Sequence, residues 1–132
     1  MNQQTAALYT EYNTFKSYEN DDSLMQQISK SLLNLGFNTK LKGYIYTKEA
    51  IYIYVKNPFI ESIVAEVYSK IARKYGVTAG SVERAIRKSI ECLWYKDSIN
   101  CCHELFQCSY IQTMHHPTNS EFIATMAEII RL

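Results

Sequence analysis

The sequence has few of the residues that interrupt helices and no segment suited to crossing a membrane. Its 132 residues include only two prolines and four glycines, which leaves little material for turns and favours an all-helical domain. No apolar run approaches the roughly 18 residues that a membrane span needs. The N-terminus has neither the basic nor the apolar stretch of a secretory signal. With 47% apolar content, we expect one cytoplasmic globular domain with its own core.

Sites for metal binding and catalysis are also scarce. The candidates for a metal are Cys101, Cys102, His103, Cys108, His115 and His116. They lack the paired C-x₂₋₄-C and H-x₃₋₅-H spacing of a zinc site, and in the cytoplasm the cysteines are expected to be reduced thiols. The sequence shows no nucleophile–base pair, no glycine loop for phosphates and no usefully spaced acid pair. It therefore predicts no metal, no cofactor and no enzymatic activity.

Positive charge is concentrated in one segment of a nearly neutral chain. The formal net charge of the whole sequence is +1, whereas residues 69–96 hold seven basic residues against two acidic ones, a net charge of +5. The basic residues are Lys70, Arg73, Lys74, Arg84, Arg87, Lys88 and Lys96. Such a local concentration indicates a surface for a polyanion.

The same segment has the pattern of a helix-turn-helix. Gly76 is placed to end a first helix with a positive φ, and Thr78 can cap a second helix, expected over about residues 78–95, through its hydroxyl. Apolar positions recur at intervals of three and four, which is typical of a helix with one buried face. They are Val82, Ala85, Ile86, Ser89, Ile90, Leu93 and Trp94. The opposite face is charged, which suits a major groove but is also the ordinary solvated side of an amphipathic helix.

The N-terminal third of the sequence is predicted to contain an acidic arm followed by one helix. Residues 1–22 form an acidic arm or a short helix, and the domain proper covers residues 23–132. Ser23 with Gln26 fits a capping box, and Gly36 is placed to end the helix that follows.

Residues 43–58 are ambiguous. Tyrosines alternating with isoleucine and valine favour a β-hairpin around residues 47–50. Thr47 as an N-cap, with Glu49 in the first turn, favours a helix instead.

Three further helices are expected towards the C-terminus. Asn57-Pro58 resembles a helix start with proline at the first position, and another short helix is predicted over residues 97–106. Thr118 and Glu121 make a second capping box. The last helix has an apolar surface wider than one core contact requires, so part of it is expected to face a partner subunit.

Four stretches of the sequence resemble one known family. They are KGYIYTKEAI (42–51), IARKYGVTA (71–79), VERAIRKSIECLW (82–94) and PTNSEFIA (117–124). Together they are similar to the C-terminal DNA-binding effector domain of the stage-zero sporulation response regulator of endospore-forming bacteria, over about residues 24–132. The resemblance implies an all-α domain of about six helices, and therefore a helix over residues 47–56. It also implies a transcription activator and repressor that binds tandem boxes of double-stranded DNA as a dimer.

The resemblance also implies roles for individual residues. The base-reading positions are Glu83, Arg84, Arg87 and Lys88, of which Arg84 suits guanine because its guanidinium can donate twice to O6 and N7. The DNA-backbone positions are Lys70, Arg73, Lys74, Thr78, Ser81, His115 and His116. The dimer interface is formed by Phe122, Ile123, Met126 and Ile130.

The chain departs from the family at three places. Ser81 stands where the family usually has an arginine, and Met114, His115 and His116 replace lysines before Pro117, so we expect weaker or altered box recognition. The family's receiver domain has no counterpart in residues 1–22, so the chain is an excised domain or, as Met1 and the polar arm favour, a stand-alone relative. These losses motivate an alternative function, a non-enzymatic protein that forms a heterodimer with a full-length regulator and modulates it.

Overall fold

The computed structural model describes residues 21–96 and 116–132, and within these ranges the protein is entirely helical. The elements are α2 (Asp21–Leu35), α3 (Lys42–Lys56), the π-helical segment η1 (Val64–Tyr68), α4 (Ser69–Tyr75), α5 (Ala79–Lys96) and α8 (Asn119–Arg131). The predicted all-α fold of about six helices is confirmed. The arm over residues 1–20 and the helix expected over residues 97–106 lie outside the described residues. None of the described helices is long and apolar enough to span a membrane.

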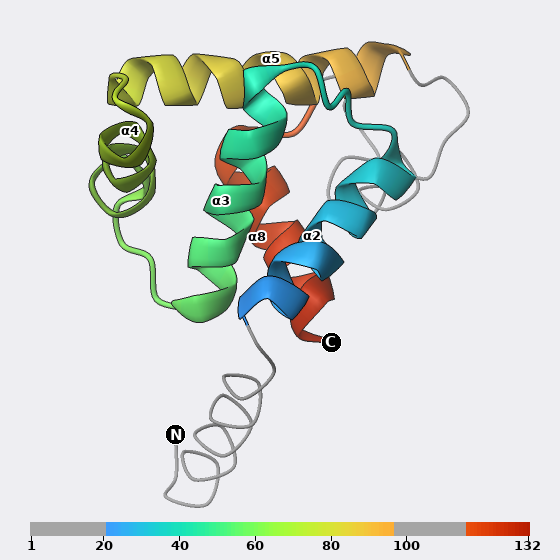
Figure 1. The fold of residues 1–132 in the computed structure, drawn as a ribbon, viewed down its shortest axis with the longest axis horizontal. Helices are drawn as coiled ribbons and strands as arrows, with labels where there is room; N and C mark the ends of the chain where they lie inside the picture. The colour runs from blue at the N-terminus through green and yellow to red at the C-terminus, as the bar shows by residue number, and fades with distance from the viewer. Residues whose placement is uncertain (1–20, 97–115) are drawn as a thin grey trace, which may run out of the picture.

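The helices are arranged around α3 and α5. In Figure 1, α5 runs along one side of the molecule, α3 crosses beneath it with α8 behind, and α2 and α4 flank α3 on opposite sides. The most extensive contacts of α3 are with α5 and α8. The largest fully buried side chains come from all of these elements and include Ile28, Leu32, Ile51, Ile71, Ile86, Ile90, Phe122, Ile123 and Met126. Burial of these side chains is the main source of the domain's stability.

The crossing of α3 and α5 depends on a glycine near the start of α3. A methyl group built on Gly43 would lie 2.1 Å from the backbone oxygen of Ala85 and 2.0 Å from Ser89 Oγ, so only glycine permits this approach. The buried hydroxyl of Thr47 donates to the Gly43 carbonyl over 2.6 Å. The first turns of α3 are therefore pressed against the middle of α5.

Glycine also ends α2, as predicted. Gly36 has φ of 102°, and the amide of Phe37 donates to the carbonyl of Leu32 over 3.1 Å. This six-to-one hydrogen bond is the signature of a Schellman C-cap, which satisfies a carbonyl that the helix leaves open.

Three predicted helix starts are wrong. Ser23 lies inside α2, whose first turn contains Asp21 and Asp22, so it does not cap that helix. Thr47 lies inside α3, which begins five residues earlier at Lys42; the helix expected over residues 47–56 is confirmed, but the cap and the hairpin alternative are not.

The third wrong start is Asn57-Pro58, which follows the end of α3. The next helical segment begins near residue 63, because the Glu66 carboxylate accepts the amides of Glu61 and Ser62 over 2.7 and 2.6 Å. This cap fixes the start of the segment downstream of Pro58.

Candidate nucleic-acid interface

The turn between α4 and α5 has the geometry of a helix-turn-helix. Gly76 adopts the left-handed conformation, with φ of 67°, and the Val77 amide donates to the Ala72 carbonyl over 3.0 Å. Thr78 Oγ1 then accepts the amide of Ser81 over 3.0 Å, which caps α5. The predicted turn and the predicted cap are both confirmed, and α5 lies within one residue of the expected helix.

The underside of α5 is anchored in the core. Val82 and Ile86 are fully buried and Ile90 is almost so, while Leu93 and Trp94 complete the same face. The predicted apolar stripe is therefore confirmed. Because this face is fixed by packing, the opposite face of α5 is held outward.

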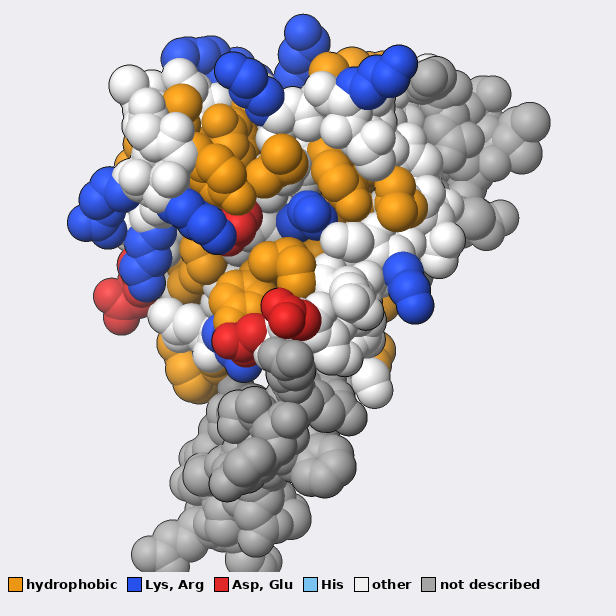
Figure 2. Space-filling view, viewed as in Figure 1, with side chains coloured by type: hydrophobic (Ala, Val, Ile, Leu, Met, Phe, Trp, Pro, Cys, Tyr) orange, Lys and Arg blue, Asp and Glu red, His pale blue; other side chains and the backbone are white. Residues whose placement is uncertain are grey.

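The outer face of α5 presents two cations that no other described group neutralises. Arg84 and Lys88 are exposed, and neither forms an ion pair within residues 21–96 and 116–132. Figure 2 shows Lys and Arg side chains along the upper edge of the molecule, over α5, and on the left, over α4. The two helices of the motif thus share one basic edge.

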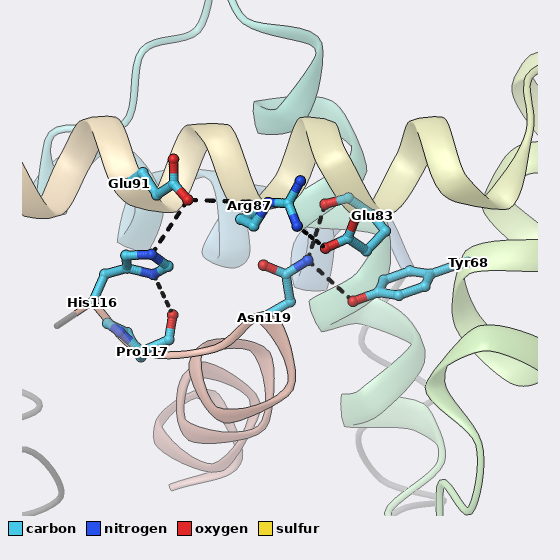
Figure 3. Close-up of polar contacts among 7 residues, drawn as sticks. All are labelled: Tyr68, Glu83, Arg87, Glu91, His116, Pro117 and Asn119. Carbon is cyan, nitrogen blue, oxygen red and sulfur yellow. Dashed lines mark hydrogen bonds and ion pairs between the residues drawn. The ribbon is translucent and has the colours of Figure 1, made fainter.

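A row of charged side chains runs along α5 beside these two cations. Arg87 Nη1 lies 3.2 Å from Glu83 Oε1, and Arg87 Nε lies 4.0 Å from Glu91 Oε1. Glu91 Oε1 also lies 3.3 Å from His116 Nε2 (Figure 3). Glu83 and Arg87, two of the four predicted base-reading residues, are therefore paired with each other within the protein.

Asn119 ties α5 to the first helix of the motif and was not predicted. Its Nδ2 donates to the hydroxyl of Tyr68 over 3.1 Å and to the backbone carbonyl of Glu83 over 3.0 Å (Figure 3). The side chain is buried at the first residue of α8, directly after the predicted cap at Thr118. A buried amide is expected to find partners, but its sequence position does not reveal which ones.

The same three elements enclose a cavity of about 280 Å³. It is lined by Tyr68, Glu83, Arg87, His116, Thr118, Asn119 and Ser120. Burial raises the pKa of Tyr68, although the hydrogen bond from Asn119 opposes that shift. Tyr68 is therefore neutral at ordinary pH and accepts the hydrogen bond from the amide.

The cations of the first helix differ in their availability. Lys70 and Arg73 are exposed and form no ion pair among the described residues. Lys74 Nζ lies 2.6 Å from Glu49 Oε1 on α3, and this hydrogen bond raises the pKa of Lys74. Glu49 Oε1 also accepts from the Tyr75 hydroxyl over 2.9 Å. Lys74 is thus partly neutralised from within the protein.

The remaining predicted site residues fall into three groups. The hydroxyls of Thr78 and Ser81 hydrogen-bond to each other over 2.9 Å at the start of α5. His116 is described, whereas His115 and the candidate metal residues 101–108 lie outside the described residues. Among the residues that are described, no three His, Cys, Asp or Glu side chains are grouped to hold a metal ion.

The residues predicted for a dimer interface are buried within one chain, and their role at an interface stays a prediction. Phe122, Ile123, Met126 and Ile130 are at most 2% exposed. α8 packs against both α3 and α5, so the wide apolar surface of this helix is used by the core. A partner that docks on α8 would meet its other positions.

Comparison with known families agrees with this geometry. Residues 28–130 match the family described as sporulation initiation factor Spo0A C terminal. The match covers most of the chain, includes every described helix in whole or in part, and confirms the resemblance drawn from the sequence. Members of this family are DNA-binding domains rather than enzymes. The chain therefore belongs to the Spo0A C-terminal family and is a DNA-binding domain of the sporulation-initiation type.

Proposed function

We propose that this protein is a sequence-specific transcription regulator that places α5 in the major groove of double-stranded DNA. The observation that carries this proposal is the exposure of Arg84 and Lys88 on a helix whose opposite face is buried in the core. A rigid helix with outward cations can meet base edges without the loss of order that a flexible loop would suffer. Arg84 is the residue best suited to guanine, since its planar fork can donate to both O6 and N7.

Backbone contacts come from the first helix of the motif. Lys70 and Arg73 are exposed beside the basic edge of α5 and are suited to phosphates, which position the protein without specifying sequence. Each phosphate contact steepens the dependence of log K on log salt by about 0.9. Lys74 contributes less than its formal charge suggests, because Glu49 holds its ammonium group.

The experiment is a binding measurement with a duplex selected by the parent protein from a randomised pool, compared with a scrambled duplex. Arg84→Ala should lose about ten- to one-hundred-fold on the selected duplex and little on the scrambled one. Arg73→Ala should weaken both duplexes by a similar factor and flatten the salt dependence by about one unit. Lys30→Ala removes an exposed charge from α2 and is the matched control, with no effect expected on discrimination.

Two results would contradict this proposal. If the parent protein does not distinguish the selected duplex from the scrambled one at moderate salt, α5 does not read sequence. If Arg84→Ala retains full discrimination, another element carries the specificity.

Binding of tandem boxes as a dimer is a second part of the proposal. Each chain supplies one α5, so two adjacent boxes need two chains. Because the apolar residues of α8 are buried, we place the contact at exposed positions such as Ala124 and Glu128. Ala124→Arg should abolish cooperative binding to a two-box duplex while leaving one-box affinity unchanged. Met126→Glu is unsuitable as a test because it would unfold the core.

The alternative, a protein that pairs with a full-length regulator and modulates it, rested on an apolar face of the last helix that was expected to remain open. That face is buried here. The alternative therefore requires the same exposed positions of α8, and Ala124→Arg tests it in a pull-down with the full-length regulator.

A further inference from the structure

The carboxylate of Glu91 is shared by an arginine and a histidine. Its Oε1 atom lies 4.0 Å from Arg87 Nε and 3.3 Å from His116 Nε2. Arg87 is one helical turn before Glu91 on α5, whereas His116 reaches the same oxygen from the segment that leads into α8 (Figure 3). The imidazole is the closer of the two, so the two side chains compete for one acceptor.

The His116 ring is held in place on three sides. Its Nδ1 lies 2.9 Å from the Pro117 carbonyl oxygen, and its Nε2 faces Glu91. The ring of Tyr95 packs edge-on against it, with centroids 6.0 Å apart and an interplanar angle of 82°. The imidazole is mostly buried, with 22% of its side chain exposed. Its orientation is therefore set by the protein.

Both ring nitrogens of His116 face oxygen acceptors. In the imidazolium form each nitrogen carries a hydrogen, and both contacts are hydrogen bonds. In either neutral tautomer one contact sets a nitrogen lone pair against an oxygen. Whenever Nε2 carries a hydrogen, the ring donates to the Glu91 carboxylate.

We propose that His116 is a positioning residue for Arg87: by holding the Glu91 carboxylate, it keeps the Arg87 guanidinium available to DNA. This inference rests on the proposed function, together with the base-reading role that the family resemblance implies for Arg87. Arg87 is already paired with Glu83 at 3.2 Å, and its pair with Glu91 is long, at 4.0 Å. Without His116, the Glu91 carboxylate is free to approach Arg87 more closely across one turn. Arg87 then has a tighter pair with Glu91 to break, in addition to its pair with Glu83, before it reaches DNA.

This role differs from the one expected from the sequence, in which His116 touches the DNA backbone directly. Its two nitrogens already have partners within the protein, so a direct phosphate contact would have to break one of them. The two roles differ in one measurable respect. A direct contact is independent of Glu91, whereas a positioning role requires it.

The test is a double-mutant cycle on affinity for the selected duplex. His116→Ala should weaken binding by about two- to five-fold, the range expected for one exposed ion pair. In the Glu91→Gln protein, the same His116→Ala change should have less than about a 1.5-fold effect. Adding Arg87→Ala should abolish the coupling between the other two positions. His116→Gln keeps a donor towards Glu91 and should retain part of the affinity.

Additive effects of His116→Ala and Glu91→Gln would overturn the inference. So would a salt dependence that flattens by about one unit on His116→Ala in both backgrounds, because that is the signature of a lost phosphate contact. Each variant is checked by thermal unfolding, and binding is compared below the melting temperature of every variant, because the His116 imidazole is mostly buried and its loss lowers stability. If the parent does not distinguish selected from scrambled duplex, the proposed function has failed; specific binding with an additive cycle overturns only the role of His116.

Discussion

Replacing Gly43 by alanine tests whether the close crossing of α3 and α5 is a structural requirement. The added methyl group would lie 2.0 Å from Ser89 Oγ and 2.1 Å from the Ala85 backbone oxygen. Favourable contacts between such atoms occur at about 3.5–4.0 Å, so the two helices would have to separate by about 1 Å or more. The Ala85 oxygen belongs to the backbone of α5 and cannot rotate away.

The size of the effect follows from two opposing terms. Alanine in place of glycine normally stabilises a helix by about 0.5–1 kcal/mol. Overpacking of a close interface costs about 1–3 kcal/mol or more, and a gap of about 0.5–1 Å forfeits a quarter to a half of the dispersion attraction across it. We expect a net loss of about 1–2 kcal/mol in the free energy of unfolding, which lowers Tm by about 4–8 °C in a domain of this size.

Chemical and thermal unfolding followed by circular dichroism measure this loss, and Gly80→Ala is the matched control. A methyl group on Gly80 meets only the flexible end of Arg84, at 3.3 Å, so this variant should be neutral or up to about 1 kcal/mol more stable. Ser89→Ala removes a buried hydroxyl that has no hydrogen-bond partner among the described residues, and should itself be neutral or slightly stabilising. It should not rescue Gly43→Ala, because the clash with the Ala85 oxygen remains. Parent-like stability of Gly43→Ala, or full rescue by Ser89→Ala, would refute the reasoning.

Three further predictions concern residues that hold or extend α5. Asn119→Ala removes both hydrogen bonds from the buried amide and leaves the Tyr68 hydroxyl without its donor, so unfolding should become easier by about 2 kcal/mol in urea titrations. Burial raises the pKa of Tyr68 above its ordinary value of 10.0, so the stability that depends on its neutral form is complete below pH 10 and is lost as pH rises through the folded-state pKa. Tyr68→Phe should reduce this alkaline loss in a pH series of melting curves. Ser81→Arg should tighten binding to both selected and scrambled duplexes and steepen the salt dependence by about 0.9, while Tm falls by a few degrees; an unchanged salt slope would show that position 81 is remote from the phosphates.

The elements that could be predicted from sequence are those whose signals are local. The turn at Gly76 needs a positive φ, the cap at Thr78 needs a hydroxyl within reach of an amide three residues on, and the apolar stripe of α5 has a helical period. Each of these requirements is met within a few residues of chain. They were therefore visible without knowledge of the fold, and the family resemblance added the rest of the all-α architecture.

The predictions that failed were overridden by specific contacts, one of them between distant residues and one between near neighbours in the sequence. Thr47 has the side chain of a helix cap, but α3 already begins at Lys42. The residue at the N-cap position is Leu41, which makes no side-chain hydrogen bond to the helix. Its first turn is stabilised instead by packing Gly43 against α5, a contact across more than forty residues of sequence. Pro58 looks like a helix start, but the Glu66 carboxylate caps the amides just before the next helical segment. Local propensity cannot weigh such contacts.

The sequence predicts which residues make up the candidate site, but not which of them form ion pairs and hydrogen bonds with one another. The sequence shows which residues of α5 are charged and which face they share. It does not show that Glu49 on α3 pairs with Lys74 or that His116 contacts Glu91. Nor does it show that the Asn119 amide donates to the Glu83 carbonyl. These contacts join elements that are far apart in sequence. They decide which cations are available, so a formal count of charge overstates the field presented to DNA.

The departure at Ser81 has a physical consequence for the start of α5. The Ser81 amide donates to Thr78 Oγ1, and the Thr78 hydroxyl donates to Ser81 Oγ, so the two side chains satisfy each other at the helix N-terminus. An arginine at this position has no oxygen to accept that hydroxyl, and its charge lies near the positive end of the helix dipole, at a cost of about 0.3–1 kcal/mol. Serine therefore gives α5 a better-capped start and gives up one contact to DNA. We therefore expect serine at this position to strengthen the fold of α5 at the expense of affinity for the phosphate backbone, which the Ser81→Arg variant tests.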